Sequence, residues 1–259
     1  MKGRITKLAS FALASTVVAS AFVAPSISQA AELKGNMGVF SKYVLRGITN
    51  NTENDGTTVQ GGLDYIHENG FYAGYWGSNL DYGNVKTDIN GTISGTNTGF
   101  ENDLYAGFAT KFSGVNVDVG VIQYVYVEVE DSNGTEVTGK VGMGPVTAGL
   151  KYLVNDVAWG NSGDIYWTLA YSTALPKDFS LGATLGFYTY NDDDAGNGKK
   201  TWVATTEDSG FRHLDLSISH AIGQTGANMS ITYVVGGKDR VGKDNENAVV
   251  LGVAYGFTI

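Results

Sequence analysis

The chain has 259 residues, a formal net charge of −9 and no cysteine. An acidic chain argues against nucleic acid as a partner and against binding to an anionic membrane surface, because both attract basic patches. The lack of cysteine excludes thiol catalysis, iron–sulfur clusters and disulfide bonds.

Residues 1–30 predict a secretory signal peptide that is separate from the folded domain. Three cations within the first seven residues precede an apolar segment, 8–23, and Ser-Gln-Ala at 28–30 supplies the small residues of a cleavage site. A membrane-spanning helix is the alternative, but the serines within the segment and the cleavage site argue against it. We therefore assign residues 31–259, with a charge of about −12, to one exported domain.

From residue 37 onward, about twelve short runs alternate apolar and polar residues. In 115–121 the odd positions are all valine, whereas Asn116, Asp118 and Gly120 occupy the even positions. A period of two residues places these sets on opposite faces of a β-strand. The same period recurs in 165–172, 179–187, 213–222, 228–235 and 251–259.

The connectors between these runs alternate in length. The short ones are 68–70, 113–114, 144–145, 176–178 and 223–226. The long, polar ones are 48–57, 83–99, 129–135, 156–163, 191–210 and 237–246. Short turns at one end and long loops at the other are typical of outer-membrane barrels. We predict an all-β fold: a single antiparallel transmembrane β-barrel of about 12 strands, with short periplasmic turns and long extracellular loops.

A soluble β-sandwich also alternates, so the ends of the strands decide between the two folds. Aromatic residues gather near the ends of the apolar faces, where rings fit the lipid headgroups; they are Tyr43, Tyr65, Phe112, Trp167, Tyr171, Phe179, Phe187 and Tyr233. The last run keeps an aromatic-rich apolar face up to Ile259. It resembles the C-terminal strand by which the barrel-assembly machinery recognises its substrates. We expect that machinery, outer-membrane lipid and lipopolysaccharide as partners, and the Gram-negative outer membrane as the location.

If the apolar faces point outward, charges of both signs enter the lumen. The expected set is Lys42, Arg46, Asp64, Asp103, Lys111, Asp118, Lys140, Lys151 and Asp215. As pore-lining residues we single out Lys42, Arg46, Lys111 and Lys151, opposed by Asp64, Asp118 and Asp215. Facing charges in a wet lumen discriminate solutes by size and charge. The alternative is a plugged lumen in which the same charges neutralise one another.

Two groups of residues invite a chemical interpretation. His213 and Asp215 share a strand face, but residues two apart stand roughly 7 Å from each other, which we interpret as too far for a direct bond in a catalytic row. The acidic run 191–198 lacks the ligand spacing of a calcium loop. We expect no enzyme activity, no cofactor and no metal site.

Three segments near the start of the domain form a specific motif: GVFSKYVLRGIT (38–49), VQGGLDYIH (59–67) and GFYAGYWGSN (70–79). Together they resemble the opening motif of the TorF family, also called the Gcw_chp family, whose members are regarded as proteobacterial porins. The resemblance implies an outer-membrane barrel and supplies no substrate or catalytic residue. We place Arg46 at the outer end of the first strand, facing the lumen.

The sequence thus leads to a ranked set of functions. The first is a porin that lets small hydrophilic solutes or ions diffuse passively through a narrow lumen of mixed charge. The second is a closed-lumen structural or adhesive barrel that acts through its acidic loops. The third is an outer-membrane hydrolase that uses His213.

Overall fold

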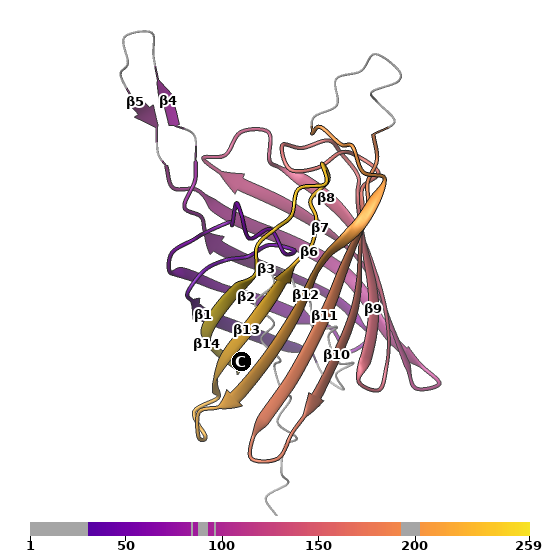
Figure 1. The fold of residues 1–259 in the computed structure, drawn as a ribbon. Helices are drawn as coiled ribbons and strands as arrows, with labels where there is room; N and C mark the ends of the chain where they lie inside the picture. Colours follow the sequence, from indigo (N-terminus) through magenta and orange to yellow (C-terminus); the bar gives the residue numbers. More distant parts are fainter. Residues whose placement is uncertain (1–30, 84, 88–92, 96, 193–202) are drawn as a thin grey trace, which may run out of the picture.

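The protein is described by a computed structural model that covers residues 31–83, 85–87, 93–95, 97–192 and 203–259. The predicted signal peptide, 1–30, lies outside the described residues, as does most of the acidic run 191–198. The described chain is a closed antiparallel β-barrel (Figure 1). No helix in the described ranges is both long and apolar enough to cross a bilayer.

Twelve strands form the barrel wall. They are β1 (Glu32–Phe40), β2 (Thr58–Ile66), β3 (Phe71–Asn79), β6 (Phe100–Phe112), β7 (Val115–Val127), β8 (Gly134–Met143), β9 (Val146–Leu153), β10 (Ile165–Ala174), β11 (Phe179–Thr189), β12 (Ser209–Ala221), β13 (Ala227–Gly236) and β14 (Ala248–Thr258). Between β3 and β6, a separate two-stranded hairpin of β4 (Val85–Thr87) and β5 (Ile93–Gly95) projects from one end (Figure 1).

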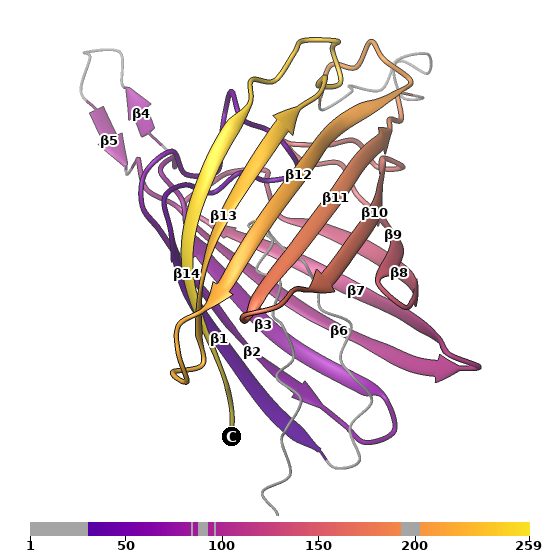
Figure 2. The ribbon, with the colours of Figure 1, turned by 60° about the horizontal axis from the view of Figure 1, so that its bottom comes forward.

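Each wall strand pairs with its neighbours along the chain, and β1 closes the ring by pairing with β14 from Lys34↔Thr258 to Phe40↔Gly252. Figure 2 shows β10 to β14 on one side of the ring and β1, β2, β3, β6 and β7 on the other. Closure leaves no free sheet edge, so the backbone donors and acceptors of the wall are satisfied by strand pairing. The predicted number of strands and their antiparallel order are confirmed.

The apolar side chains face away from the barrel axis. Val119, Leu169 and Val253 are 49–53 % exposed, whereas Asp118 and Thr232, which have the opposite parity, are buried inside. A sandwich would bury the first set, so the inversion excludes it and gives the fold of an outer-membrane β-barrel. The short turns lie at the end that holds the C-terminus, and the long connections lie at the other end (Figure 1).

The structure corrects the predicted first strand. That strand ends at Phe40, and residues 41–57, which we call the inner loop, fold into the outer end of the barrel. Tyr43, predicted on the outer apolar face, is fully buried inside instead. Two features hold this loop inside the barrel: the Tyr43 hydroxyl donates to the buried Glu101, and Arg46 and Gly47 both have positive φ, of 48° and 72°, a conformation that cannot continue a strand.

Candidate functional site

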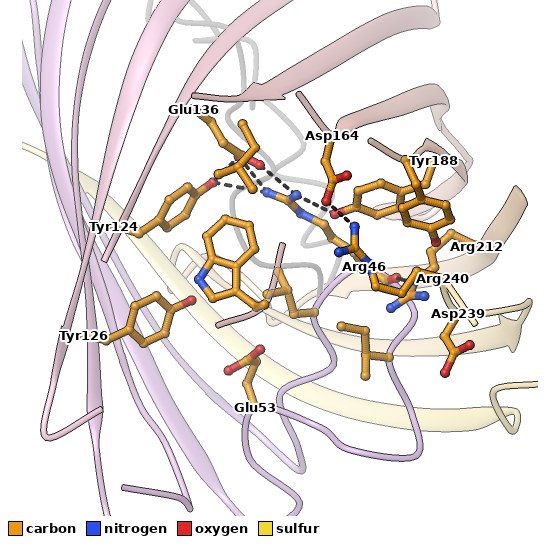
Figure 3. A pocket seen from close by; sticks show the side chains of 15 residues that line it. Arg46, Glu53, Tyr124, Tyr126, Glu136, Asp164, Tyr188, Arg212, Asp239 and Arg240 are labelled. Carbon is orange, nitrogen blue, oxygen red and sulfur yellow. Dashed lines mark hydrogen bonds and ion pairs between the residues drawn. The ribbon is translucent and has the colours of Figure 1, made fainter. Parts of the chain in front are cut away.

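Arg46 of the inner loop lies at the centre of the outer barrel and crosses it from strand to strand (Figure 3). Its Nη1 and Nη2 donate to the two carboxylate oxygens of Glu136 on β8, at 2.8 and 2.7 Å. Nη1 also donates to the Tyr188 hydroxyl on β11, at 2.7 Å. The guanidinium lies 4.8 Å from the ring centroid of Tyr166 on β10. Arg46 is 4 % exposed, so this bidentate pair is shielded from water and strong.

The Glu136 end of this crossing continues into a polar network. The Tyr124 hydroxyl on β7 donates to Glu136 Oε2 at 2.7 Å, and Lys151 Nζ on β9 donates to the same hydroxyl at 3.2 Å. Lys151 Nζ is also 4.0 Å from Glu136 Oε2. Glu136 therefore lies within ion-pair distance of two buried basic side chains, Arg46 from the inner loop and Lys151 from the wall.

A second attachment of the inner loop consists of acids and tyrosines. The buried Glu101 on β6 accepts hydrogen bonds from the Tyr43 and Tyr126 hydroxyls, at 2.8 and 3.1 Å. Glu53 accepts a very short hydrogen bond from Tyr82. Burial, reinforced by the negative charge of Glu101, raises the pKa of Glu53 to about 8. At neutral pH, Glu53 is thus mostly protonated.

The third group is a row of three side chains below Arg46. Asp215 Oδ1 is 2.8 Å from His213 Nδ1, and His213 Nε2 is 2.7 Å from the Tyr166 hydroxyl. Our prediction that His213 and Asp215 are too far apart to bond is therefore wrong. The backbone spacing on a strand is unchanged, but the imidazole and the carboxylate lean toward each other and close the gap.

The predicted lumen charges find mainly local partners. Asp64 accepts from the Tyr105 hydroxyl, and Asp118 accepts from Tyr72 and pairs across the strands with Lys140. Other members lie apart from the central crossing: Lys42 pairs with Asp55 inside the inner loop, and Lys111 is exposed at the turn end of β6. The structure thus brings Arg46 and Lys151 together around Glu136.

A pocket opens on the outer side of Arg46, and its empty space of about 690 Å³ includes open solvent. Arg46, Arg212 and Arg240 line it together with Tyr188 and Tyr190 (Figure 3). The two tyrosine rings stack, with centroids 5.0 Å apart and planes 7° from parallel. Arg212 lies 5.7 Å from the Tyr188 ring and Arg240 lies 4.9 Å from the Tyr190 ring, both within cation–π range.

Sequence reasoning missed two of the central residues. Glu136 adjoins the predicted loop 129–135, yet it shares strand parity with Lys140, and that parity could have placed it in the lumen. Arg212 gave no such signal. The register shifts where Gly186 pairs with His213 and Phe187 pairs with Phe211, so Arg212 is the extra residue of a β-bulge and its side chain points inward beside His213.

We next consider whether the residues of this region could bind a metal ion. Among the residues with described positions, no three His, Asp or Glu side chains converge as metal ligands. The acids of the site instead bond to arginine and tyrosine. The arrangement is suited to holding a loop across a polar lumen and to contacting a polar solute.

Comparison with known proteins identifies the family and the fold of the chain. The family model described as "Bacterial protein of unknown function (Gcw_chp)" matches residues 26–257, and its description does not carry the TorF name. No curated protein matches the chain.

Two solved structures share the fold. A structure titled "KdgM porin" is similar at 10 % identity and TM-score 0.50, over 86 % of this chain and 99 % of that one. The COG4313 outer membrane channel from Pseudomonas putida F1 is similar at 8 % identity and TM-score 0.51, over 92 % and 98 %. These likenesses concern the fold, and the family match confirms the resemblance seen in the sequence: the chain belongs to the Gcw_chp family.

Proposed function

We propose that the protein is a porin-like channel of the Gram-negative outer membrane, through which small hydrophilic solutes or ions diffuse passively. The apolar exterior suits outer-membrane lipid and lipopolysaccharide, and we expect insertion by the barrel-assembly machinery. The polar interior supports passage of hydrophilic solutes. Two solved structures with this fold are a porin and an outer membrane channel, which supports the proposal.

One observation carries this proposal: the inner loop holds Arg46 and Glu136 face to face in the middle of the lumen. Once the inner loop moves aside and water enters, ionised groups at this level of the lumen would select solutes by charge and size. Of the residues that we expect to line the pore, Arg46 and Lys151 lie beside Glu136, Asp64 and Asp118 lie near the short-turn ends of β2 and β7, and Asp215 lies beside His213. We propose Arg46 as the constriction charge.

A closed-lumen structural barrel is the second candidate, and the burial of the crossing favours it. Tyr43, Arg46, Glu101 and Glu136 are all between 0 and 4 % exposed, so side chains fill the outer lumen around the inner loop. For conduction, the inner loop has to move aside. A hydrolase is disfavoured, because both ring nitrogens of the buried His213 are held, by Asp215 and by the Tyr166 hydroxyl rather than a serine.

Single-channel recording in planar bilayers separates the two candidates. Stepwise conductance from heat-modifiable, correctly folded protein is the expected result, whereas silence from such protein would leave the structural barrel. Arg46→Gln should lower anion preference relative to the wild type, because it removes a lumenal positive charge. Lys111→Gln, which removes a charge at the exposed turn end, is the control.

A further inference from the structure

The bulge in β12 points the positive charge of Arg212 into the barrel, where regular strand alternation would not place it. Along β12 the inward residues are His213, Asp215 and Ser217, so a regular strand would point Arg212 toward lipid. The bulge turns Arg212 inward instead, and it is only 7 % exposed. Bulges that re-aim a side chain are frequent next to functional sites.

Arg212 is buried without a carboxylate. Its Nε donates to the carbonyl of Arg46 at 3.1 Å, and its Nη1 donates to the carbonyl of Lys238 at 3.3 Å. Within the described part of the chain, no carboxylate oxygen lies within 4.0 Å of its guanidinium. A buried cation without a counter-ion is unfavourable, and carbonyl groups and the Tyr188 ring compensate for it only in part.

Two further arginine donors of the same pocket are left without partners. Arg46 Nε and Arg240 Nη1 are buried and have no hydrogen-bond acceptor among the described residues. Both side chains line the pocket with Arg212. Unpaired buried donors cost free energy, and an acceptor brought by a ligand would recover it.

Each acid that lines this pocket has partners other than Arg212. Glu136 accepts from Arg46, and Asp164 accepts from Arg240 and from the backbone N–H groups of Asn161 and Asn191. Asp239 accepts from the backbone amides of Val241 and Lys243 within its own loop. Burial keeps Glu53 largely protonated at neutral pH. Arg212 is therefore the arginine of this pocket that has no carboxylate partner within ion-pair distance among the described residues.

We infer that the pocket between Arg46, Arg212, Arg240 and the stacked Tyr188 and Tyr190 binds the carboxylate group of a small organic solute at the outer mouth of the barrel. Arg212 supplies the charge, and Arg46 and Arg240, whose side chains line the same pocket, each keep an unpartnered buried donor beside it. The stacked rings of Tyr188 and Tyr190 line the same pocket and offer apolar contact to the body of the solute. This inference deepens the proposed function by naming its solute class. Transport of that solute rests on the proposed channel function, whereas its binding in the pocket does not.

Titration calorimetry of the detergent-solubilised full barrel at low ionic strength tests the inference. Gluconate is the probe, and glucose, which has similar size and hydroxyl groups but no carboxylate, is its neutral counterpart. Gluconate should bind measurably tighter than glucose. Arg212→Gln should weaken gluconate binding about tenfold or more, the size expected from one charge-assisted hydrogen-bonded contact. Lys243→Gln removes the same charge from an exposed position of the neighbouring loop and should leave the affinity unchanged.

The comparison of gluconate with glucose on the wild-type protein needs no variant to fold, so it decides by itself if Arg212→Gln does not assemble. Equal binding of both probes, absence of gluconate binding, or full gluconate affinity in folded Arg212→Gln would overturn the inference. Gluconate binding by a barrel that does not conduct would sustain the binding site and refute the channel. Conductance without gluconate binding would sustain the channel and refute the binding site.

Discussion

Gly47 lies against His213 so closely that a Cβ on Gly47 would stand 2.3 Å from the Cβ of His213. The inner loop and β12 thus meet at a point where only glycine fits. Gly47 also has φ +72°, a conformation that other residues adopt at a cost. This contact fixes the depth of Arg46 in the lumen, and it joins the loop to the Asp215–His213–Tyr166 row.

Gly47→Ala should push the inner loop away from β12. We expect a destabilisation of roughly 1–3 kcal/mol from the forced conformation and the clash. In planar bilayers, the variant should conduct more often than the wild type, because Arg46 no longer reaches its partners. Gly56→Ala in the same loop is the matched control, since its φ is not positive and its nearest neighbour is 3.5 Å away. Equal unfolding curves for both variants would contradict the role of this contact.

The pair of Arg46 and Glu136 should behave as a buried ion pair. Arg46→Gln or Glu136→Gln alone leaves the partner charge buried, at a cost of about 3–5 kcal/mol in unfolding free energy. The double variant should recover part of that loss, because neither charge remains. Denaturant unfolding of the four proteins gives the coupling energy.

Lys42→Gln is the control for this cycle. Its pair with Asp55 lies on the exposed side of the inner loop, where such pairs contribute about 1 kcal/mol or less. A loss as large as that of Arg46→Gln would mean that burial does not distinguish the two pairs.

Stability should fall as the pH rises from about 5 through 8. The pKa of Glu53 is about 8 in the folded protein and 4.5 as its ordinary value, so the folded state holds the proton that the unfolded state has lost in that range. The contribution is fully present below the ordinary pKa and is lost as pH passes the raised one. Thermal unfolding between pH 5 and 9 measures it.

Glu53→Gln should flatten this pH dependence, because glutamine cannot ionise. Asp55→Asn, which changes an exposed carboxylate of the same loop, should keep the wild-type profile. If Glu53→Gln also keeps that profile, the buried carboxyl is not the titrating group.

Removing the Tyr166 hydroxyl tests the row below Arg46. Tyr166→Phe leaves His213 Nε2 buried without its partner and should lower the unfolding free energy by about 1–3 kcal/mol. Tyr171→Phe, on the outward face of the same strand, should change it little. We expect no lipid-ester cleavage from the wild type. Cleavage that disappears in His213→Ala would instead support the hydrolase.

The wall of this protein follows from its sequence alone. Strict alternation in segments such as 115–121, the alternating connector lengths and the apolar last strand determine twelve antiparallel strands with an outward apolar face, because strand parity is a local property. By the same parity, Asp118 and Asp215 could be placed inside. The opening motif also identified the Gcw_chp family.

Only the tertiary structure decided what fills the barrel. The fold of the inner loop depends on the left-handed pair Arg46-Gly47 and on partners 90 and 142 residues away, Glu136 and Tyr188. The inward turn of Arg212 depends on a register shift between β11 and β12. Both depend on contacts distant in sequence and on one-residue irregularities of the backbone, which no periodicity within a single strand records.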